Sequence, residues 1–257
     1  MKRSAIALLF LCSGGTLAAQ PHWKLCHEDN EVYPWILKER EGLYATLARL
    51  TARRTQSEIE LVGMPWKRCL AEMQAGTIDG VLGAGFLAER CKQGVYPGGA
   101  CQPDPSLHLY YDRFMLYRAK QAHLHWDGQV LRDYRKPIAV QPGFVVARLL
   151  KQSGIPTDES DKSPYQILRK VSAGMVDGAI LQAPAADPLL QEVTDFGSTI
   201  ERDPIPFRVY PTWLMISHQR YRANATLVQA LWQAMAQARD SGEYKAAKLA
   251  LGYNEPD

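Results

Sequence analysis

The pattern of apolar and polar positions predicts alternating strands and helices in the first half of the chain. Leu43, Leu47 and Leu50 have the spacing of one helix face. The apolar stretch 78–84, interrupted by Asp79 and by glycines, has the length of a buried strand. In order, we expect strand, helix, strand, helix and strand at 23–27, 42–54, 59–62, 66–74 and 78–84. This order predicts a parallel α/β sheet.

A second series of the same kind follows an irregular connection. Residues 92–106 are rich in Gly, Pro and Cys, which indicates a loop, and 107–117 is a long extended stretch rich in aromatic residues. The pattern then predicts strands at 137–140 and 176–181, helices at 144–152 and 165–173, a second extended stretch at 207–217, and helices at 225–238 and 244–251.

One segment of the first series recurs in the second. Residues 75–82 read AGTIDGVL and residues 173–180 read AGMVDGAI, with Leu70 and Leu168 at matching positions upstream. Each copy fits a helix closed by Gly, a tight turn and a buried parallel strand. Any α/β chain can repeat such a connection by chance, but the shared identities favour two similarly built lobes.

The order of the two series predicts interleaved lobes. We expect the chain to cross between lobes near 110–119 and to cross back near 205–215. We assign 20–112 and 210–257 to lobe 1, and 113–209 to lobe 2. The predicted fold class is therefore α/β, with two interleaved doubly wound lobes joined by two crossing strands. A ligand would bind between the lobes.

The first residues have the pattern of a secretory signal peptide. Lys2 and Arg3 precede a short apolar run at 5–12, which is too short to span a bilayer, and small residues follow it. We expect cleavage after Ala18 or Ala19, so that residues 1–19 form the signal peptide and the mature chain is located in the periplasm.

Composition and charge then exclude several classes of function. The chain has 257 residues, 46% of them hydrophobic, and a formal net charge of +3. This charge is too small and too evenly spread to favour nucleic acid or an anionic membrane, so we expect neither partner, and we expect a monomer. The sequence has no P-loop, no G-x-S-x-G and no H-E-x-x-H. His123 and His125 lack a third ligand nearby. We predict no catalytic residue, no cofactor and no metal site.

Four cysteines remain after the leader. They are Cys26, Cys69, Cys91 and Cys101, an even number in an oxidising compartment, without a C-x-x-C spacing. Disulfides are therefore favoured over a zinc site or free thiols. Of the possible connectivities we favour Cys91 with Cys101, which closes a Gly/Pro-rich loop, and Cys26 with Cys69, which joins the first strand to a helix start.

A series of short motifs spans the mature chain. It consists of Tyr33-Pro34-Trp35, the helix start 64–68, the turn 75–79, Glu89-Arg90, Gln141-Pro142-Gly143 and the second turn 174–177. In this order the motifs resemble the type II periplasmic solute-binding proteins, the family that includes the amino-acid-binding components of ABC importers. The resemblance implies a two-lobed fold, a small-molecule ligand, and an ABC permease or a membrane sensor as partner.

The resemblance also implies a set of ligand-binding residues. Asp29 corresponds to a polar residue of the cleft, Trp66 to an aromatic residue that stacks on the ligand, and Arg90 to the arginine that holds a ligand carboxylate. Gly143 corresponds to a helix start whose N–H groups face an anion. The predicted ligand-binding set is Asp29, Trp35, Trp66, Arg90, Gln141, Gly143 and Gln182.

Two positions depart from the amino-acid binders. The amino-acid binders have a Ser or Thr before the arginine, where this chain has Gly-Phe-Leu-Ala at 85–88. They also have an aspartate in the second lobe that receives the ligand ammonium, where this chain has Gln182. We therefore expect a small organic ligand that is amino-acid-like, a carboxylate or aromatic. Without the resemblance, Arg90 would be interpreted as a solvated residue beside Glu89, and Trp66 as a core residue.

Two other functions stay open at this stage. A secreted dehydratase of the cyclohexadienyl type uses the same fold and would need a carboxylic acid in its cleft, for which Glu28 or Asp29 is available. The ligand-binding subunit of a sensor system would present its closed form to a membrane receptor. The main prediction is a binding protein without enzymatic activity that captures its ligand for an ABC importer by closing its lobes.

Overall fold

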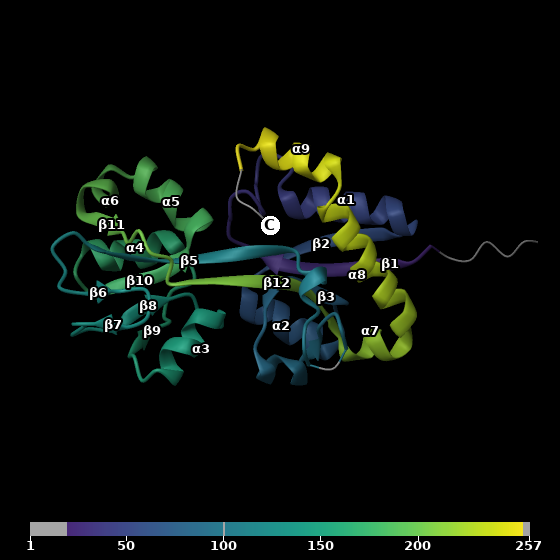
Figure 1. The fold of residues 1–257 in the computed structure, drawn as a ribbon, viewed down its shortest axis with the longest axis horizontal. Coiled ribbons are helices and arrows are strands. Elements are labelled where there is room, and N and C mark those ends of the chain that lie inside the picture. The colour runs from purple at the N-terminus through teal and green to yellow at the C-terminus, as the bar shows by residue number, and fades with distance from the viewer. Residues whose placement is uncertain (1–19, 100, 254–257) are drawn as a thin grey trace, which may run out of the picture.

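The protein is described by a computed structural model that covers residues 20–99 and 101–253. The predicted signal peptide, 1–19, lies outside the described residues. Figure 1 shows two lobes side by side, with two long strands running from one to the other. Among the residues that the structure describes, no helix has the length and apolarity needed to cross a bilayer.

One ten-stranded sheet runs through both lobes, in the order β2-β1-β3-β12-β5-β10-β8-β9, with β4 paired to β12 and β11 paired to β5. Its strands are β1 (His22–Glu28), β2 (Glu58–Met64), β3 (Gly80–Gly85), β4 (Gly94–Val95), β5 (Tyr110–Ala119), β8 (Ile138–Val140), β9 (Thr157–Asp158), β10 (Gly178–Gln182), β11 (Ile200–Arg202) and β12 (Arg208–Ser217). A separate ribbon pairs β6 (His125–Trp126) with β7 (Leu131–Arg132). The strands β1, β2 and β3 are parallel to one another, as are β8, β9 and β10. The predicted parallel sheet in each lobe is confirmed.

The strands β5 and β12 are the predicted crossing strands. They pair with each other, antiparallel, over residues 110–114 and 208–212. Beyond this shared part, β12 continues along β3 in the first lobe and β5 continues along β10 in the second. Each crossing strand therefore belongs to both lobes, and residues 110–114 and 208–212 are the natural position for a hinge.

Helices cover both faces of the sheet in each lobe. In the first lobe they are α1 (Leu43–Thr55), α2 (Trp66–Ala75), α7 (His218–Ala223), α8 (Ala225–Arg239) and α9 (Gly242–Ala250); in the second they are α3 (Val145–Gln152), α4 (Pro164–Ser172), α5 (Ala183–Glu192) and α6 (Thr194–Thr199). Short 3-10 turns η1 (Ala88–Lys92) and η2 (Pro105–Leu107) lie in the connection between β3 and β5. Each lobe has two apolar clusters, because side chains of its strands are buried on both faces.

The duplicated turn has the predicted geometry in both lobes. Gly76 follows α2 with φ 80°, and Gly174 follows α4 with φ 66°. This left-handed conformation favours glycine and lets the backbone turn back to satisfy the last carbonyls of the helix. From these turns, Asp79 accepts a hydrogen bond from the backbone N–H of Lys24 in β1, and Asp177 accepts one from the backbone N–H of Lys136, just before β8. Both aspartates therefore have a structural role.

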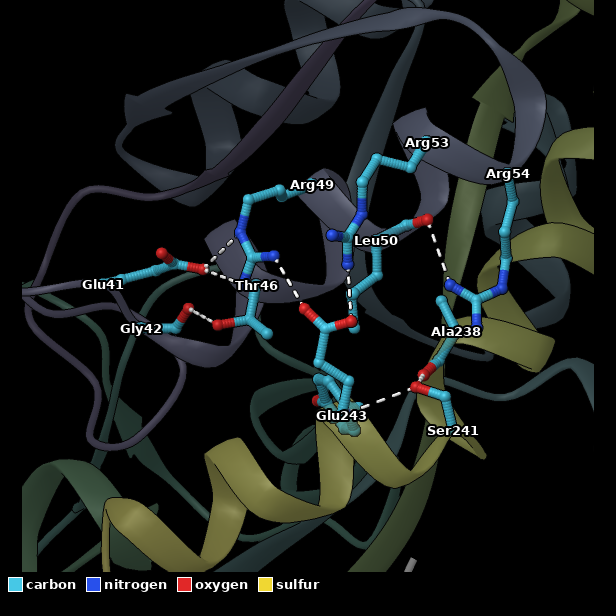
Figure 2. A network of polar contacts seen from close by, with 11 residues as sticks. Glu41, Gly42, Thr46, Arg49, Leu50, Arg53, Arg54, Ala238, Ser241 and Glu243 are labelled. Atoms are coloured by element: carbon cyan, nitrogen blue, oxygen red, sulfur yellow. Dashed lines mark hydrogen bonds and ion pairs between the residues drawn. The ribbon is translucent and has the colours of Figure 1, made fainter.

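The C-terminal helices return to the first lobe. Figure 2 shows Glu243 of α9 between Arg49 and Arg53 of α1, with nitrogen to oxygen distances of 3.0 and 2.6 Å. Arg49 also pairs with Glu41, 3.0 Å away. Exposed ion pairs of this kind add little to stability, whereas Tyr244 of α9 is fully buried in the core beside them. Segments near both ends of the described chain thus form one lobe.

The predicted disulfides are confirmed. Cys26 of β1 is bonded to Cys69 of α2, and Cys91 of η1 to Cys101, each with a Cα–Cα distance of 5.7 Å. The first bond links two elements 43 residues apart, and the second closes a loop of 10 residues.

Candidate ligand-binding cavity between the lobes

A cavity lies where the crossing strands meet the two lobes. Its walls come from β1, α1, α2, β3 and η1 of the first lobe, from α3 and β10 of the second, and from β5 and β12 between them. The space open to the centres of water-sized molecules is about 40 Å³, enough for a few waters. The lobes are therefore nearly closed on each other.

Side chains of both lobes meet at the edge of this cavity. The ring centroids of Trp66 and Phe144 are 6.2 Å apart. Arg148 of α3 forms an ion pair with Glu89 of η1, at the exposed rim. The described conformation is a closed one, in which η1 and α2 of the first lobe contact the beginning of α3 in the second.

Arg90 is buried, with 4% of its surface exposed, so it is not the solvated residue that its neighbour Glu89 would suggest. Its Nη1 donates to the carbonyl of Gly85 and its Nη2 to the carbonyl of Gly143, each at 2.7 Å. Its Cζ lies 5.6 Å from the ring centroid of Trp66. Burial lowers the pKa of Arg90, but a guanidinium stays charged in proteins. The arginine lines the cavity and also joins the two lobes.

Two tryptophans supply apolar walls. The ring of Trp35 stacks on that of Tyr110, with centroids 3.8 Å apart. Trp66 begins α2, and its backbone N–H donates to Oε2 of Glu28 at 3.1 Å. Both tryptophans line the cavity and are largely buried. Their ring faces can contact the carbon frame of a ligand.

Asp112 lies in the crossing strand β5 and lines the cavity with 7% of its surface exposed. Its Oδ2 accepts a 2.6 Å hydrogen bond from Nε2 of Gln182, at the end of β10. Burial raises the pKa of Asp112 to about 7, although the hydrogen bond from Gln182 acts in the opposite direction. Gln182 was predicted from the sequence and Asp112 was not. The sequence signal for Asp112 is a single acidic residue within an extended stretch rich in aromatic residues.

Glu28 ends β1 and is the second carboxyl group of the cavity. Besides the N–H of Trp66, it accepts hydrogen bonds through Oε1 from the Asp29 N–H at 3.1 Å and from Nδ2 of Asn30 at 3.2 Å. Burial, followed by the hydrogen bond with the Asp29 side chain, raises the pKa of Glu28 to about 7. From the sequence, Glu28 was expected solely as the candidate acid of a dehydratase.

A pair of tyrosines adds neutral polar groups. The hydroxyl oxygens of Tyr44 and Tyr110 are 2.9 Å apart and hydrogen-bonded. Burial raises the pKa of both phenols, so both are protonated near neutral pH. Gly83 lies beside them with φ 79°, and a Cβ at this position would overlap the Tyr44 hydroxyl. None of these three residues was predicted, because they come from separate elements.

The remaining predicted residues lie at or beyond the edge. Gln141 is buried in a small adjoining pocket and donates through Nε2 to the carbonyl of Lys162 at 2.8 Å. Gly143 contacts the cavity residue Arg90 through its carbonyl. Asp29 is exposed and does not line the cavity. The structure thus brings together Trp35, Trp66, Arg90 and Gln182. Within the described ranges, no group of three or more His, Cys, Asp or Glu residues could hold a metal ion.

The sequence matches no family model and no curated protein. Solved structures match the fold. An ancestral arginine-binding protein bound to glutamine has 16% identity and a TM-score of 0.70, with 92% of this chain and 100% of that chain covered. A histidine kinase sensor domain with similarity to periplasmic binding proteins has 15% identity and a TM-score of 0.72, with 92% and 99% covered. An arginine-specific periplasmic binding protein of Salmonella typhimurium has 15% identity and a TM-score of 0.66, with 90% and 98% covered. At such identities the likeness establishes the fold: the chain has the two-lobed α/β fold of periplasmic binding proteins.

Proposed function

We propose that this chain is a periplasmic solute-binding protein that closes its two lobes on a small organic molecule. The observation that carries the proposal is the cavity at the crossing strands, which residues of both lobes line together. The ancestral arginine-binding protein of the same fold, bound to glutamine, supports it.

The closed conformation implies how binding would proceed. In the closed form the centres of water-sized molecules can occupy only about 40 Å³ of the cavity, so the lobes must separate for an organic ligand to enter. Rotation about 110–114 and 208–212 would open it and break the bond between Arg90 and Gly143. A ligand that contacts both lobes shifts the equilibrium towards the closed form by its differential affinity for that form.

We further propose that the mature chain is a periplasmic monomer that passes its ligand to an ABC permease. Its two disulfides suit an oxidising compartment. We place the lobe boundaries in the crossing strands, with 20–112 and 210–257 in lobe 1 and 113–209 in lobe 2. A solute-binding protein needs a surface on each lobe that its permease can recognise in the closed form.

A second candidate is the ligand-binding part of a sensor system, which the likeness to a histidine kinase sensor domain favours. Both functions use the same closure. Copurification of the full-length chain from its native membrane fraction separates them, because a permease partner supports import and a kinase partner supports sensing.

Mass spectrometry of the protein, purified without added ligand and then denatured, would identify a copurifying molecule. Thermal shift and calorimetry against amino acids, carboxylates, amines and aromatic compounds would then measure its affinity. Saturable binding of one compound with a stoichiometry near unity is the expected result. A panel without any binder would contradict the proposal, and conversion of prephenate or arogenate to an aromatic product would replace it with the dehydratase function, with Glu28 as the candidate acid.

A further inference from the structure

We infer that the ligand of this cavity carries a positively charged nitrogen group, an amine or a guanidine, and that it needs no carboxylate. This inference rests on the proposed solute-binding function and specifies the chemical class of the solute. It follows from the charges that line the cavity, the engagement of its arginine and the nature of its walls.

The cavity contains more carboxyl groups than cations. Glu28 and Asp112 line it with 9% and 7% of their surfaces exposed. Their contacts among the described residues are hydrogen bonds from backbone N–H groups, from the amides of Asn30 and Gln182 and, for Glu28, with the side chain of Asp29; neither carboxyl forms an ion pair there. A buried carboxylate without a counterion is unfavourable, so a ligand cation would supply the missing charge.

The arginine of the cavity, Arg90, already makes hydrogen bonds within the protein. Both terminal nitrogens of Arg90 donate to backbone carbonyls, one in each lobe. These bonds use two of the five N–H groups of the guanidinium, and a ligand carboxylate that took the Nη2–H bonded to Gly143 would displace the bond that keeps the lobes together. A cationic ligand leaves that bond in place, so closure and binding support each other.

The walls suit an organic cation. Trp35, Trp66, Phe114, Phe144 and Tyr210 line the cavity. Aromatic ring faces attract ammonium and guanidinium groups, and they also contact the carbon chain that carries them. Gln182 adds a neutral acceptor, because it uses Nε2 to hold Asp112 and retains its amide oxygen.

The protonation of the carboxyl groups agrees with this geometry. Burial raises the pKa of Glu28 and of Asp112 to about 7. Asp112 is faced by the protonated Tyr44 and Tyr110 and by the amide of Gln182. Glu28 is faced by Asp29. The cation of the cavity is Arg90. A bound cation favours the ionised carboxylates and therefore releases protons.

Two matched series of compounds test the inference by calorimetry on the mature chain at neutral pH. Cadaverine, δ-aminovalerate and glutarate have the same five-carbon chain and end in two amines, one amine and one carboxylate, or two carboxylates. Phenethylamine and phenylpropanoate form the aromatic pair. We expect at least one amine to bind at millimolar concentration or better, with proton release to the buffer, and its carboxylate partner to bind at least about 10-fold more weakly.

Charge-neutral variants locate the contact. For the amine that binds, Asp112→Asn or Glu28→Gln should lower affinity about 30-fold or more, since each removes one partner of a buried charge pair. Glu39→Gln removes the same charge from an exposed position and should leave affinity unchanged. Circular dichroism and thermal unfolding verify that each variant is folded.

The inference is overturned if a carboxylate binds as tightly as its amine partner, if no amine and no guanidine binds, or if a folded Asp112→Asn and a folded Glu28→Gln both retain full affinity. Binding of a neutral or anionic compound from the wider panel would agree with the solute-binding function but contradict the inference that the ligand is a cation. Absence of any binder would contradict the function itself.

Discussion

The guanidinium of Arg90 in the first lobe donates a 2.7 Å hydrogen bond to the backbone carbonyl of Gly143 in the second. Both residues were predicted from the sequence to bind the ligand, and in the closed structure they are bound to each other. Because this bond is part-buried and involves a charged donor, it contributes more to closure than an exposed ion pair at the rim.

Arg90→Lys should shift the protein towards an open form. A lysine cannot reproduce the two carbonyl bonds that the planar guanidinium makes to Gly85 and Gly143. We expect a larger radius of gyration in solution X-ray scattering and a loss of about 1–3 kcal/mol in the free energy of unfolding.

Arg148→Gln is the matched control, because it removes the exposed interlobe ion pair with Glu89. It should change the unfolding free energy by less than about 1 kcal/mol and leave the scattering unchanged. An Arg90→Lys protein as compact as the unmodified chain would contradict a role for Arg90 in closure. An Arg90→Ala protein with unchanged ligand affinity would show that Arg90 is not part of the ligand-binding site.

The buried carboxyl of Asp112 predicts a dependence of stability on pH. Its pKa is about 7 in the folded protein and near 3.8 when solvated. Between these values the folded chain keeps a proton that the unfolded chain releases, so the free energy of unfolding falls as pH rises from about 4 to about 7. For this one group the fall is at most about 4 kcal/mol.

Asp112→Asn lacks this titration. Relative to the unmodified chain, its unfolding free energy in urea should therefore increase between pH 4 and 8, whereas Glu39→Gln should show a constant difference. Parallel curves for Asp112→Asn and the unmodified chain would show that Asp112 is ionised normally in the folded protein.

The two disulfides should stabilise the fold to different extents. Loop-closure entropy assigns about 4 kcal/mol to the bond between Cys26 and Cys69, which are 43 residues apart, and about 3 kcal/mol to the bond between Cys91 and Cys101, which are 10 apart. Double alanine variants of each pair, compared by urea unfolding, measure the difference. A larger loss on removing the short loop's bond would contradict this order.

The local pattern of apolar and polar residues was sufficient to predict most of the helices and strands, but it predicted few of the residues that line the cavity. The repeated turns at Gly76 and Gly174 were predictable because helix termination and strand burial are properties of adjacent residues. The helix α5 was missed, since Pro184 and Pro188 interrupt the periodic pattern there. Asp112 was also missed, because its position in the cavity depends on the pairing of β5 with strands from both lobes.

Gly83→Ala isolates the contribution of the tyrosine pair. Gly83 has φ 79°, and a methyl group there would overlap the hydroxyl of Tyr44 and approach that of Tyr110 to 3.1 Å. Gly154 has a similar φ of 72°, with nothing within 4 Å of an added Cβ, so Gly154→Ala measures the backbone strain alone. We expect Gly154→Ala to cost about 1 kcal/mol of unfolding free energy and Gly83→Ala about 2–3 kcal/mol, since the second also separates a buried hydrogen-bonded pair. Because both hydroxyls lie at the cavity, Gly83→Ala should in addition weaken ligand binding while Gly154→Ala does not. Equal effects of the two variants on stability and binding would mean that the tyrosine pair adjusts freely and does not shape the cavity.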